Sequence, residues 1–450
     1  MRFRETFRRG LASIAFSGVF AGLTIAVGAD TPPASNSPDA EQSKPLSPLS
    51  PELVQLRNRL RGVLATYAPK HLDASERSCW EVMHGIIGYG VNAQLFRSGP
   101  GSPKVNAVGW MCYNQPCHGE QLFYLDRGTL VARRGPGLQG HLGQFLAIVA
   151  QSHVPADFPM QVGGKKFTLQ DLINHEKSDC REGEELTFKL IGLSHYLDSD
   201  AEWTTTNGQK WNIPRLIREE LKQPILRVAA CGGNHRLMGH SYALYKRRKQ
   251  GKPIDGQFLR AEKFIADYHR YTWGLQNADG SFSTRWFEGR EAKPDLDRRL
   301  KTTGHTLEWM AFSIPEEQLQ APRMVKAVNY LVDLLAKNSN REWEVGPRGH
   351  AIHALRIYDR RLFKPRDLVT PTSTPTEPPA AAKAKAPEQT TVTTAKKLKS
   401  EPAEPRVDLT ARPEPPKSSG RRKQESPRPT PLTPAGSPEV PPIEFTPSDD

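Results

Sequence analysis

The pair His305 and Glu308 is the arrangement in this sequence best suited to moving a proton. The two residues are three apart, so on a helix they share a face. Removal of a proton next to a carbonyl group needs a base with a pKa near neutral, and imidazole has one. The positive N-terminal end of a helix favours neutral histidine, which is the free base. We therefore predict acid/base chemistry at His305, with Glu308 orienting the ring or exchanging protons with it.

Further histidines would serve the opposite face of a substrate. The candidates are His350, His353 and His235, the first two again three residues apart. The alternative is that such histidines cap helices and form hydrogen bonds within a core. Because each buried imidazole costs free energy, that role is hard to assign to all of the histidines at once.

Other polar and aromatic side chains would contact the substrate. Tryptophan stacks on the faces of sugars, although it is also common in helical cores, and arginine binds anionic groups. The expected contacts are His141, Trp309, Arg348 and Trp80, and residues with the same potential are Arg236, Arg285, Tyr242 and Trp286. A small molecule or a glycan is the partner that these side chains favour.

A separate group of possible metal ligands lies in residues 110–119. Cys112, Cys117 and His118 have the chemistry to bind zinc there. In an exported chain a disulfide between Cys112 and Cys117 is the favoured state, so we expect no metal or other cofactor, with zinc as the alternative. The chain has five cysteines, and this odd number leaves at least one thiol outside any intramolecular pair.

The histidines must be carried by helices of a particular kind. Six segments are apolar almost all round, with glycine and histidine among their residues: 79–88, 140–149, 186–197, 232–240, 304–309 and 349–355. A helix that is apolar on every side must be surrounded by protein. Between them lie amphipathic segments with apolar residues at helical spacing, as in 53–64, 258–265 and 325–334.

These two kinds of helix fit one architecture. We predict an all-α fold over residues 51–365, an (α/α)6 toroid or barrel with the apolar helices as an inner ring and the amphipathic helices as an outer ring. Residues 121–131 depart from this pattern, because Asp126–Gly128 between two short apolar runs is typical of a β-hairpin insertion. The uneven spacing of the histidine segments predicts long loops at one rim of the barrel.

The alternating helices resemble the α/α toroids of terpenoid cyclases and protein prenyltransferases. Residues 271–282, Tyr-Thr-Trp-Gly-Leu-Gln-Asn-Ala-Asp-Gly-Ser-Phe, are similar to the Gln/Trp repeat of squalene-type cyclases, with Phe282 where tryptophan is usual. The resemblance implies that Gln276 caps helix ends and that the aromatic ring stacks on it. The sequence has no Asp-x-Asp-Asp motif, so polyene cyclisation is not supported.

A second resemblance concerns the histidine already singled out. Gly-His-Thr-Leu-Glu-Trp, residues 304–309, resembles the Gly-His-x-x-Glu-Trp stretch of N-acylglucosamine 2-epimerases and related sugar isomerases, which are also helical barrels. This likeness implies a carbohydrate substrate and an acid/base role for His305. The rival functions are a non-catalytic binding or scaffold protein of the cell envelope and a terpenoid cyclase-like or zinc-dependent toroid enzyme.

Both ends of the chain differ from its middle. Arginines ahead of an apolar run that ends in small residues predict a signal peptide over residues 1–29, with an uncleaved membrane anchor as the alternative. Residues 30–50 are predicted to be a disordered linker, and residues 366–450 a disordered proline-rich tail. We expect a protein exported to the periplasm or the cell exterior, with a tail that contacts envelope components or only adds solubility.

The chain carries a net charge of +13, which suits anionic partners. However, no run of lysine and arginine is interleaved with aromatic residues, so a nucleic-acid partner is not expected.

Overall fold

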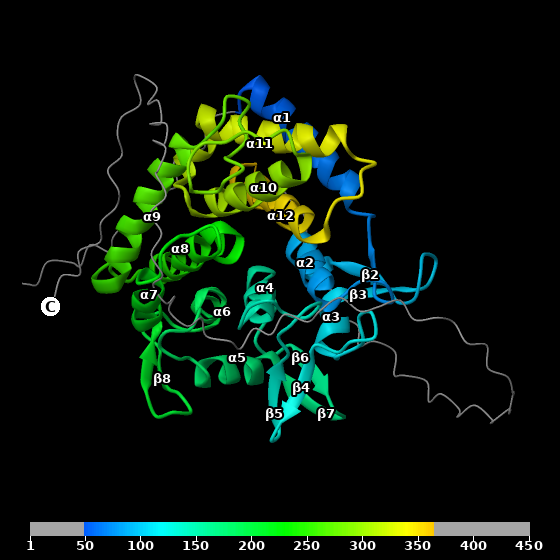
Figure 1. The fold of residues 1–450 in the computed structure, drawn as a ribbon, viewed down its shortest axis with the longest axis vertical. Helices are drawn as coiled ribbons and strands as arrows, with labels where there is room; N and C mark the ends of the chain where they lie inside the picture. The colour runs from blue at the N-terminus through cyan, green and yellow to red at the C-terminus, as the bar shows by residue number, and fades with distance from the viewer. Residues whose placement is uncertain (1–48, 364–450) are drawn as a thin grey trace, which may run out of the picture. The chain divides into compact units, whose positions relative to one another are not determined.

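The computed structural model describes residues 49–363, of which 54% are helical. Twelve α-helices and nine short β-strands follow one another in this part of the chain (Figure 1). The predicted signal peptide, nearly all of the predicted linker and the proline-rich tail lie outside the described residues.

The six apolar segments all contribute to helices with buried residues on every side. The six helices are α2 (Cys79–Tyr89), α4 (Gln144–Gln151), α6 (Thr187–Tyr196), α8 (Asn234–Lys249), α10 (Leu296–Ser313) and α12 (Val345–Leu362). Each packs against the next of the set along the chain, and α12 packs against α2. We call these six the inner helices (Figure 1).

The remaining long helices bury one face only, and we call them the outer helices. They are α1 (Pro51–Tyr67), α5 (Leu169–Ser178), α7 (Ile213–Leu221), α9 (Gly256–Gly274) and α11 (Pro322–Lys337). In α1 the buried face includes Leu53, Leu56 and Leu60, at the helical spacing that the sequence predicts. Each of these helices packs against at least one inner helix, for example α5 on α6, α9 on α8 and α11 on α10.

The segment that resembles a Gln/Trp repeat joins two of the outer helices. The side-chain amide of Gln276 donates hydrogen bonds to the carbonyl oxygens of Gly280 at 3.2 Å and Arg323 at 2.9 Å. Arg323 lies in the first turn of α11, and the rings of Trp273 and Phe282 have centroids 6.0 Å apart. The glutamine therefore ties the end of α9 to the start of α11.

The predicted β-hairpin is confirmed, but the all-α prediction was too narrow. Strands β4 (Phe123–Asp126) and β5 (Thr129–Ala132) pair antiparallel around Arg127 and Gly128, whose positive φ angles of 48° and 87° suit a two-residue turn. Two further hairpins and a three-stranded sheet accompany it in the described residues: β6 (Pro159–Val162) with β7 (Lys165–Thr168), β8 (Glu202–Thr204) with β9 (Lys210–Asn212), and β1 (Leu72–Asp73), β2 (Gln94–Phe96) and β3 (Lys104–Asn106).

Three of these extra strands lead directly into helices. Strands β3, β7 and β9 each end immediately before a helix: α3 (Ala107–Cys112), α5 and α7 respectively. With only two to four residues, the strands are too short to show an alternating pattern in the sequence.

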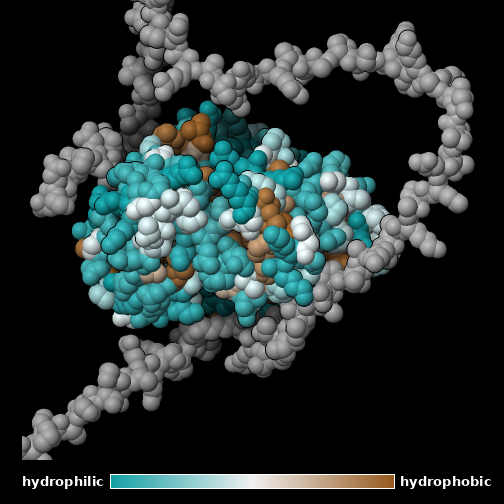
Figure 2. Space-filling view, turned by 90° about the horizontal axis from the view of Figure 1, so that it is seen from below, coloured by the Kyte–Doolittle hydropathy of each residue, from teal (hydrophilic) through white to brown (hydrophobic). Residues whose placement is uncertain are grey.

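The face of the molecule in Figure 2 is mostly polar. It also carries separate small hydrophobic patches. Among the described helices, none combines the length and the apolar character that crossing a membrane requires.

Candidate functional site

Four histidine rings from four inner helices meet in one place. They belong to His84 of α2, His235 of α8, His305 of α10 and His350 of α12, and we call them the histidine cluster. The His350 ring centroid lies 3.9 Å from that of His305, 5.0 Å from that of His235 and 5.4 Å from that of His84. All four residues are at least 94% buried. The predicted residues His235, His305 and His350 are thus brought together.

The glycines that precede two of these histidines explain how the helices approach so closely. A methyl group at Gly349 would lie 2.2 Å from the carbonyl oxygen of His84, and one at Gly304 would lie 3.2 Å from the Cα atom of Ala351. Only glycine at position 349 therefore allows α12 to pack this tightly on α2. Each glycine creates the close contact, and the next residue, His350 or His305, contributes to the cluster.

Three of the cluster histidines donate one ring hydrogen to an oxygen. The Nδ1 atoms of His84, His305 and His350 lie 2.6, 2.7 and 2.8 Å from the Trp80 carbonyl, the Lys301 carbonyl and a Glu308 carboxylate oxygen. A carbonyl or carboxylate oxygen only accepts, so in the neutral ring the proton sits on Nδ1. The lone pair of Nε2 is then left for another partner.

Burial keeps the cluster uncharged. It lowers the pKa of His84 and of His350 to about 3. It also lowers the pKa of His235 and of His305 well below the ordinary value. Neighbouring imidazoles add to the effect at His84, His235 and His305. Imidazoles with such pKa values are weak bases at neutral pH. Neutral imidazole is the form that binds metal ions, so the cluster is better prepared for ligation than for direct proton abstraction.

Glu308 does not contact His305 in the way the sequence predicted. Its two carboxylate oxygens accept hydrogen bonds from Nδ1 of His350 at 2.8 Å and of His353 at 2.6 Å. The His305 ring is bonded instead to the Lys301 carbonyl one turn earlier in its own helix. Burial raises the pKa of Glu308, and the hydrogen bond from His353 opposes that shift. Glu308 thus orients His350, not His305.

Cys231 completes a set of possible metal ligands. The ligand atoms of Cys231, His235 and His305 all lie within 4.8 Å of one another. Cys231 is part-exposed, whereas the two histidines are buried. Burial of the thiol raises the pKa of Cys231 to about 12. The amide of the buried Asn234 donates to the Cys231 carbonyl at 3.0 Å, while its own side-chain oxygen has no partner among the described residues.

The backbone around Cys231 is unusual. Cys231 itself has φ 47° and ψ 48°, and Gly232 and Gly233 continue in the left-handed region with φ 66° and 94°. A methyl group at Gly232 would lie 2.3 Å from the ring of Trp286, a residue whose own φ is 59°. Two non-glycine residues in the left-handed region therefore lie at one place. Such strain costs free energy and is typical of functional sites.

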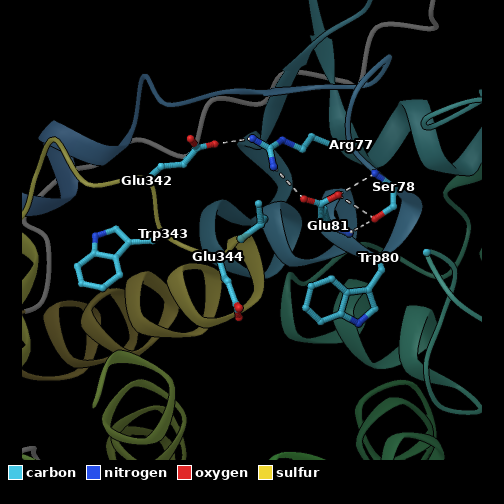
Figure 3. A pocket seen from close by; sticks show the side chains of 9 residues that line it. Arg77, Ser78, Trp80, Glu81, Glu342, Trp343 and Glu344 are labelled. Atoms are coloured by element: carbon cyan, nitrogen blue, oxygen red, sulfur yellow. Dashed lines mark hydrogen bonds and ion pairs between the residues drawn. The ribbon is translucent and has the colours of Figure 1, made fainter. Parts of the chain in front are cut away.

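Two predicted substrate contacts lie beside the cluster. The Trp80 ring contacts that of His84, with centroids 3.8 Å apart and planes tilted by 37°, and Trp80 lines a pocket with Arg77, Ser78 and Glu81 (Figure 3). His141 precedes α4, where its Nδ1 atom lies 2.6 Å from a Glu185 carboxylate oxygen. Its ring stacks on Phe188 at 4.9 Å, and Phe188 lies 5.0 Å from His235.

Other predicted contacts have structural roles. Trp309 is fully buried, donates a hydrogen bond to Ser241 at 3.1 Å and stacks on His269, so it belongs to the core. The charge of Arg348 lowers the pKa of Tyr67 and of Tyr89 against the larger effect of burial.

Arg236, Arg285, Tyr242 and Trp286 were also considered as substrate contacts from the sequence. Of these, Arg236 and Tyr242 are part of the core. Arg236 forms a buried ion pair with Glu220 at 2.9 Å, and Tyr242 stacks on Phe312 at 4.4 Å. Arg285 and Trp286 instead line a pocket that Cys231 also lines.

The predicted disulfide between Cys112 and Cys117 is not formed, because all five cysteines are free thiols. Cys112 is buried in the last position of α3, whereas the Cys117 thiol lies 3.6 Å from the Met111 sulfur and forms a hydrogen bond with Cys79. His118 is exposed, and its Nδ1 atom lies 3.3 Å from the Ser75 carbonyl. The three residues thus have separate surroundings.

Cys231 and His84 were missed as site residues by the sequence analysis. The signal available for Cys231 was its position four residues before His235 with two glycines between them. For His84 it was membership of the same apolar, glycine-containing class of segment as His305 and His350. Comparison with known protein families, curated proteins and solved structures finds no match to this chain.

Proposed function

We propose that the protein is an exported enzyme of the α/α toroid class whose reaction centre is a transition-metal ion held by Cys231, His235 and His305. The toroid is supported by the order of helix contacts, in which each inner helix packs on the next and α12 packs on α2. Export is supported by the composition of residues 1–29.

The observation that carries the proposal is the convergence of three ligand atoms within 4.8 Å. One thiolate and two neutral imidazoles form a donor set that suits zinc. Three protein ligands leave a fourth position of a tetrahedral ion open for water or substrate, as in catalytic rather than structural zinc sites. The hydrogen bond from His305 to the Lys301 carbonyl fixes its ring, which is how such ligands are usually oriented.

A zinc ion lowers the pKa of bound water to about 7 and polarises carbonyl or phosphoryl oxygens. His350 and Glu308 would then handle the proton. The His350 ring is too weak a base to keep a proton, so it would only pass one on: Nε2 would take up the proton as the Nδ1 proton moves along the hydrogen bond to Glu308. This relay retains the acid/base role predicted for His350 and Glu308 and reassigns His305 as a ligand. The substrate is a small polar molecule, with carbohydrates as the first class to examine.

The test is metal analysis of the chain purified without chelators. We expect about one zinc ion per chain, lost in Cys231→Ser and retained in Cys180→Ser, a control in which the thiol is buried elsewhere. Hydrolysis of nitrophenyl esters, phosphates and glycosides by the same proteins would then identify the reaction. A folded wild-type chain that neither contains zinc nor takes it up would overturn the proposal.

A further inference from the structure

A pocket of about 430 Å³ opens beside Cys231 and carries mostly positive charge. One side of the pocket is the loop that precedes α8. The other side is the loop that precedes α10 together with the first turns of α10. Five cationic side chains line it: Arg227, Arg285, Lys293, Arg298 and Lys301. Glu291 and Asp295 are the acidic residues in its lining. We call this the cationic pocket.

The two acidic residues have partners within the lining and at the start of α10. Asp295 caps α10 by accepting hydrogen bonds from the backbone nitrogens of Asp297 and Arg298, at 3.0 and 3.1 Å. Glu291 accepts a hydrogen bond from Thr284 at 2.6 Å and lies 3.8 Å from the Lys293 ammonium. The two carboxylates offset two of the five positive charges, so the pocket keeps an excess of positive charge.

Three of the cations have no salt-bridge partner within 4.0 Å among the described residues: Arg285, Arg298 and Lys301. Arg298 is held in place, since its Nε–H donates to the Thr284 carbonyl at 2.7 Å and its guanidinium lies 5.1 Å from the centre of the Trp286 ring. Burial lowers the pKa of Arg298, the charge of Glu291 and then of Asp295 opposes that shift, and the charge of Arg227 adds to it. Five cations against two carboxylates leave this part-buried pocket with excess positive charge, which favours an anionic ligand.

The same cations lie close to the proposed reaction centre. Lys301 precedes His305 by one helical turn, and its carbonyl accepts the His305 hydrogen bond. The charges of Lys301 and Arg298 act on the Cys231 thiol, whose pKa they lower against the larger effect of burial. Cys231 lines the pocket itself. An anionic group held by these side chains would therefore lie next to the open position of the metal.

We propose that the cationic pocket binds the carboxylate or phosphate group of the substrate and so presents the rest of the molecule to Cys231, His235 and His305. The substrate class becomes an acidic sugar, a sugar phosphate or a similar small anion. This inference rests on the proposed function, because the anion is useful to catalysis only if a metal ion is bound at Cys231, His235 and His305. The binding of the anion can nevertheless be measured separately.

The experiment is isothermal titration calorimetry of the full chain with glucuronate, glucose 6-phosphate and inorganic phosphate, with neutral glucose for comparison. We expect at least one anion to bind far more tightly than glucose, and the stronger of glucuronate and glucose 6-phosphate to identify the preferred group. Arg285→Gln and Lys301→Gln should each weaken binding by about tenfold, because each removes one charged hydrogen bond. Arg77→Gln, which changes a paired cation in the Trp80 pocket, should leave binding unchanged.

The two proposals fail in different ways. If the anion binds and the variants weaken it while the chain holds no zinc, the pocket is supported and the metal centre is overturned. If zinc is present but the anions bind no better than glucose, or bind Lys301→Gln and Arg285→Gln as well as the wild type, the pocket assignment is overturned and the metal centre stands.

Discussion

Two pockets lie at the N-terminal ends of inner helices, and they use charge in opposite ways. The Trp80 pocket, of about 510 Å³, lies where α2 and α12 begin, and the cationic pocket lies where α8 and α10 begin. In the Trp80 pocket Arg77 lies 3.0 Å from both Glu81 and Glu342 (Figure 3). Glu81 also completes a capping box with Ser78.

The comparison teaches that the size of a pocket says little about its role. In the Trp80 pocket Arg77, Glu81 and Glu342 pair with one another where they cap the start of α2 and hold a loop against it, so these charges stabilise the fold. Glu344 adds an acidic charge to the lining. In the cationic pocket Arg285, Arg298 and Lys301 have no salt-bridge partner in the described part of the chain. Unbalanced charge next to possible metal ligands is the better indication of a ligand site.

The strongest test of this contrast removes a metal ligand beside one pocket and a cap beside the other. His235→Ala should lose bound zinc and reduce turnover by about a thousandfold, which corresponds to about 4 kcal/mol. Ser78→Ala should keep zinc and turnover, and should lose about 1 kcal/mol of stability because an N-cap is removed. Metal analysis, steady-state kinetics and urea unfolding measure the three effects. Equal losses of zinc in both variants would show that the two pockets do not differ as described.

A second test concerns the helix contact that lies under the Trp80 pocket. Gly349→Ala should destabilise the protein by about 3 kcal/mol, because its methyl group would lie 2.2 Å from the His84 carbonyl oxygen. Gly62→Ala is the matched control, since nothing lies within 4 Å of that position in α1. It should be neutral or stabilising by about 1 kcal/mol. A wild-type midpoint in urea for Gly349→Ala would contradict the close packing of α12 on α2.

A third test asks whether an unpartnered polar group always marks a ligand site. His240 of α8 is fully buried, its two ring nitrogens have no partner among the described residues, and burial lowers its pKa to about 3. Below pH 6.5 the unfolded chain takes up a proton at this histidine and the folded chain does not, so stability falls as the pH falls toward 3. At pH 5 the loss is about 2 kcal/mol relative to neutral pH.

His240→Leu should remove that part of the acid sensitivity without changing zinc content or anion binding. Urea unfolding at pH 7 and pH 5 measures the difference. An unchanged pH dependence would mean that water reaches the His240 ring. The difference drawn between this buried histidine and the unpaired cations of the cationic pocket would then be wrong.

The smallest effect is expected in the Trp80 pocket itself. Arg77→Gln breaks two ion pairs whose partners are exposed to different degrees, 24% for Glu81 and 84% for Glu342. Because solvent screens such pairs, stability should fall by about 1 kcal/mol or less, and salt should reduce the difference. Thermal unfolding at low and high salt provides the measurement. A loss of several kcal/mol would show that this network does more than tie a loop to α2.

The sequence was sufficient for the features that depend on local pattern. Apolar character on all sides predicted the buried helices, and Asp126–Gly128 between apolar runs predicted the β4–β5 hairpin. The grouping of His235, His305 and His350 followed from their shared place in such helices.

What sequence reasoning could not reach depends on contacts between distant segments. Glu308 faces α12, where His350 and His353 bond to its two carboxylate oxygens, and no spacing within α10 reveals this pairing. Cys231 becomes a possible ligand only through a left-handed turn against Trp286, 55 residues further along the chain. The cationic pocket likewise needs two loops on different helices.

The tight approach of α12 to α2 also limits how far related chains can diverge. Any side chain larger than hydrogen at Gly349 would separate the two backbones and carry His350 away from its neighbours. The polar faces of the outer helices carry no comparable restriction. Distant homologues should therefore preserve glycine followed by histidine at these crossings while most other positions drift, and the intervals between such pairs would reveal kinship that overall identity conceals.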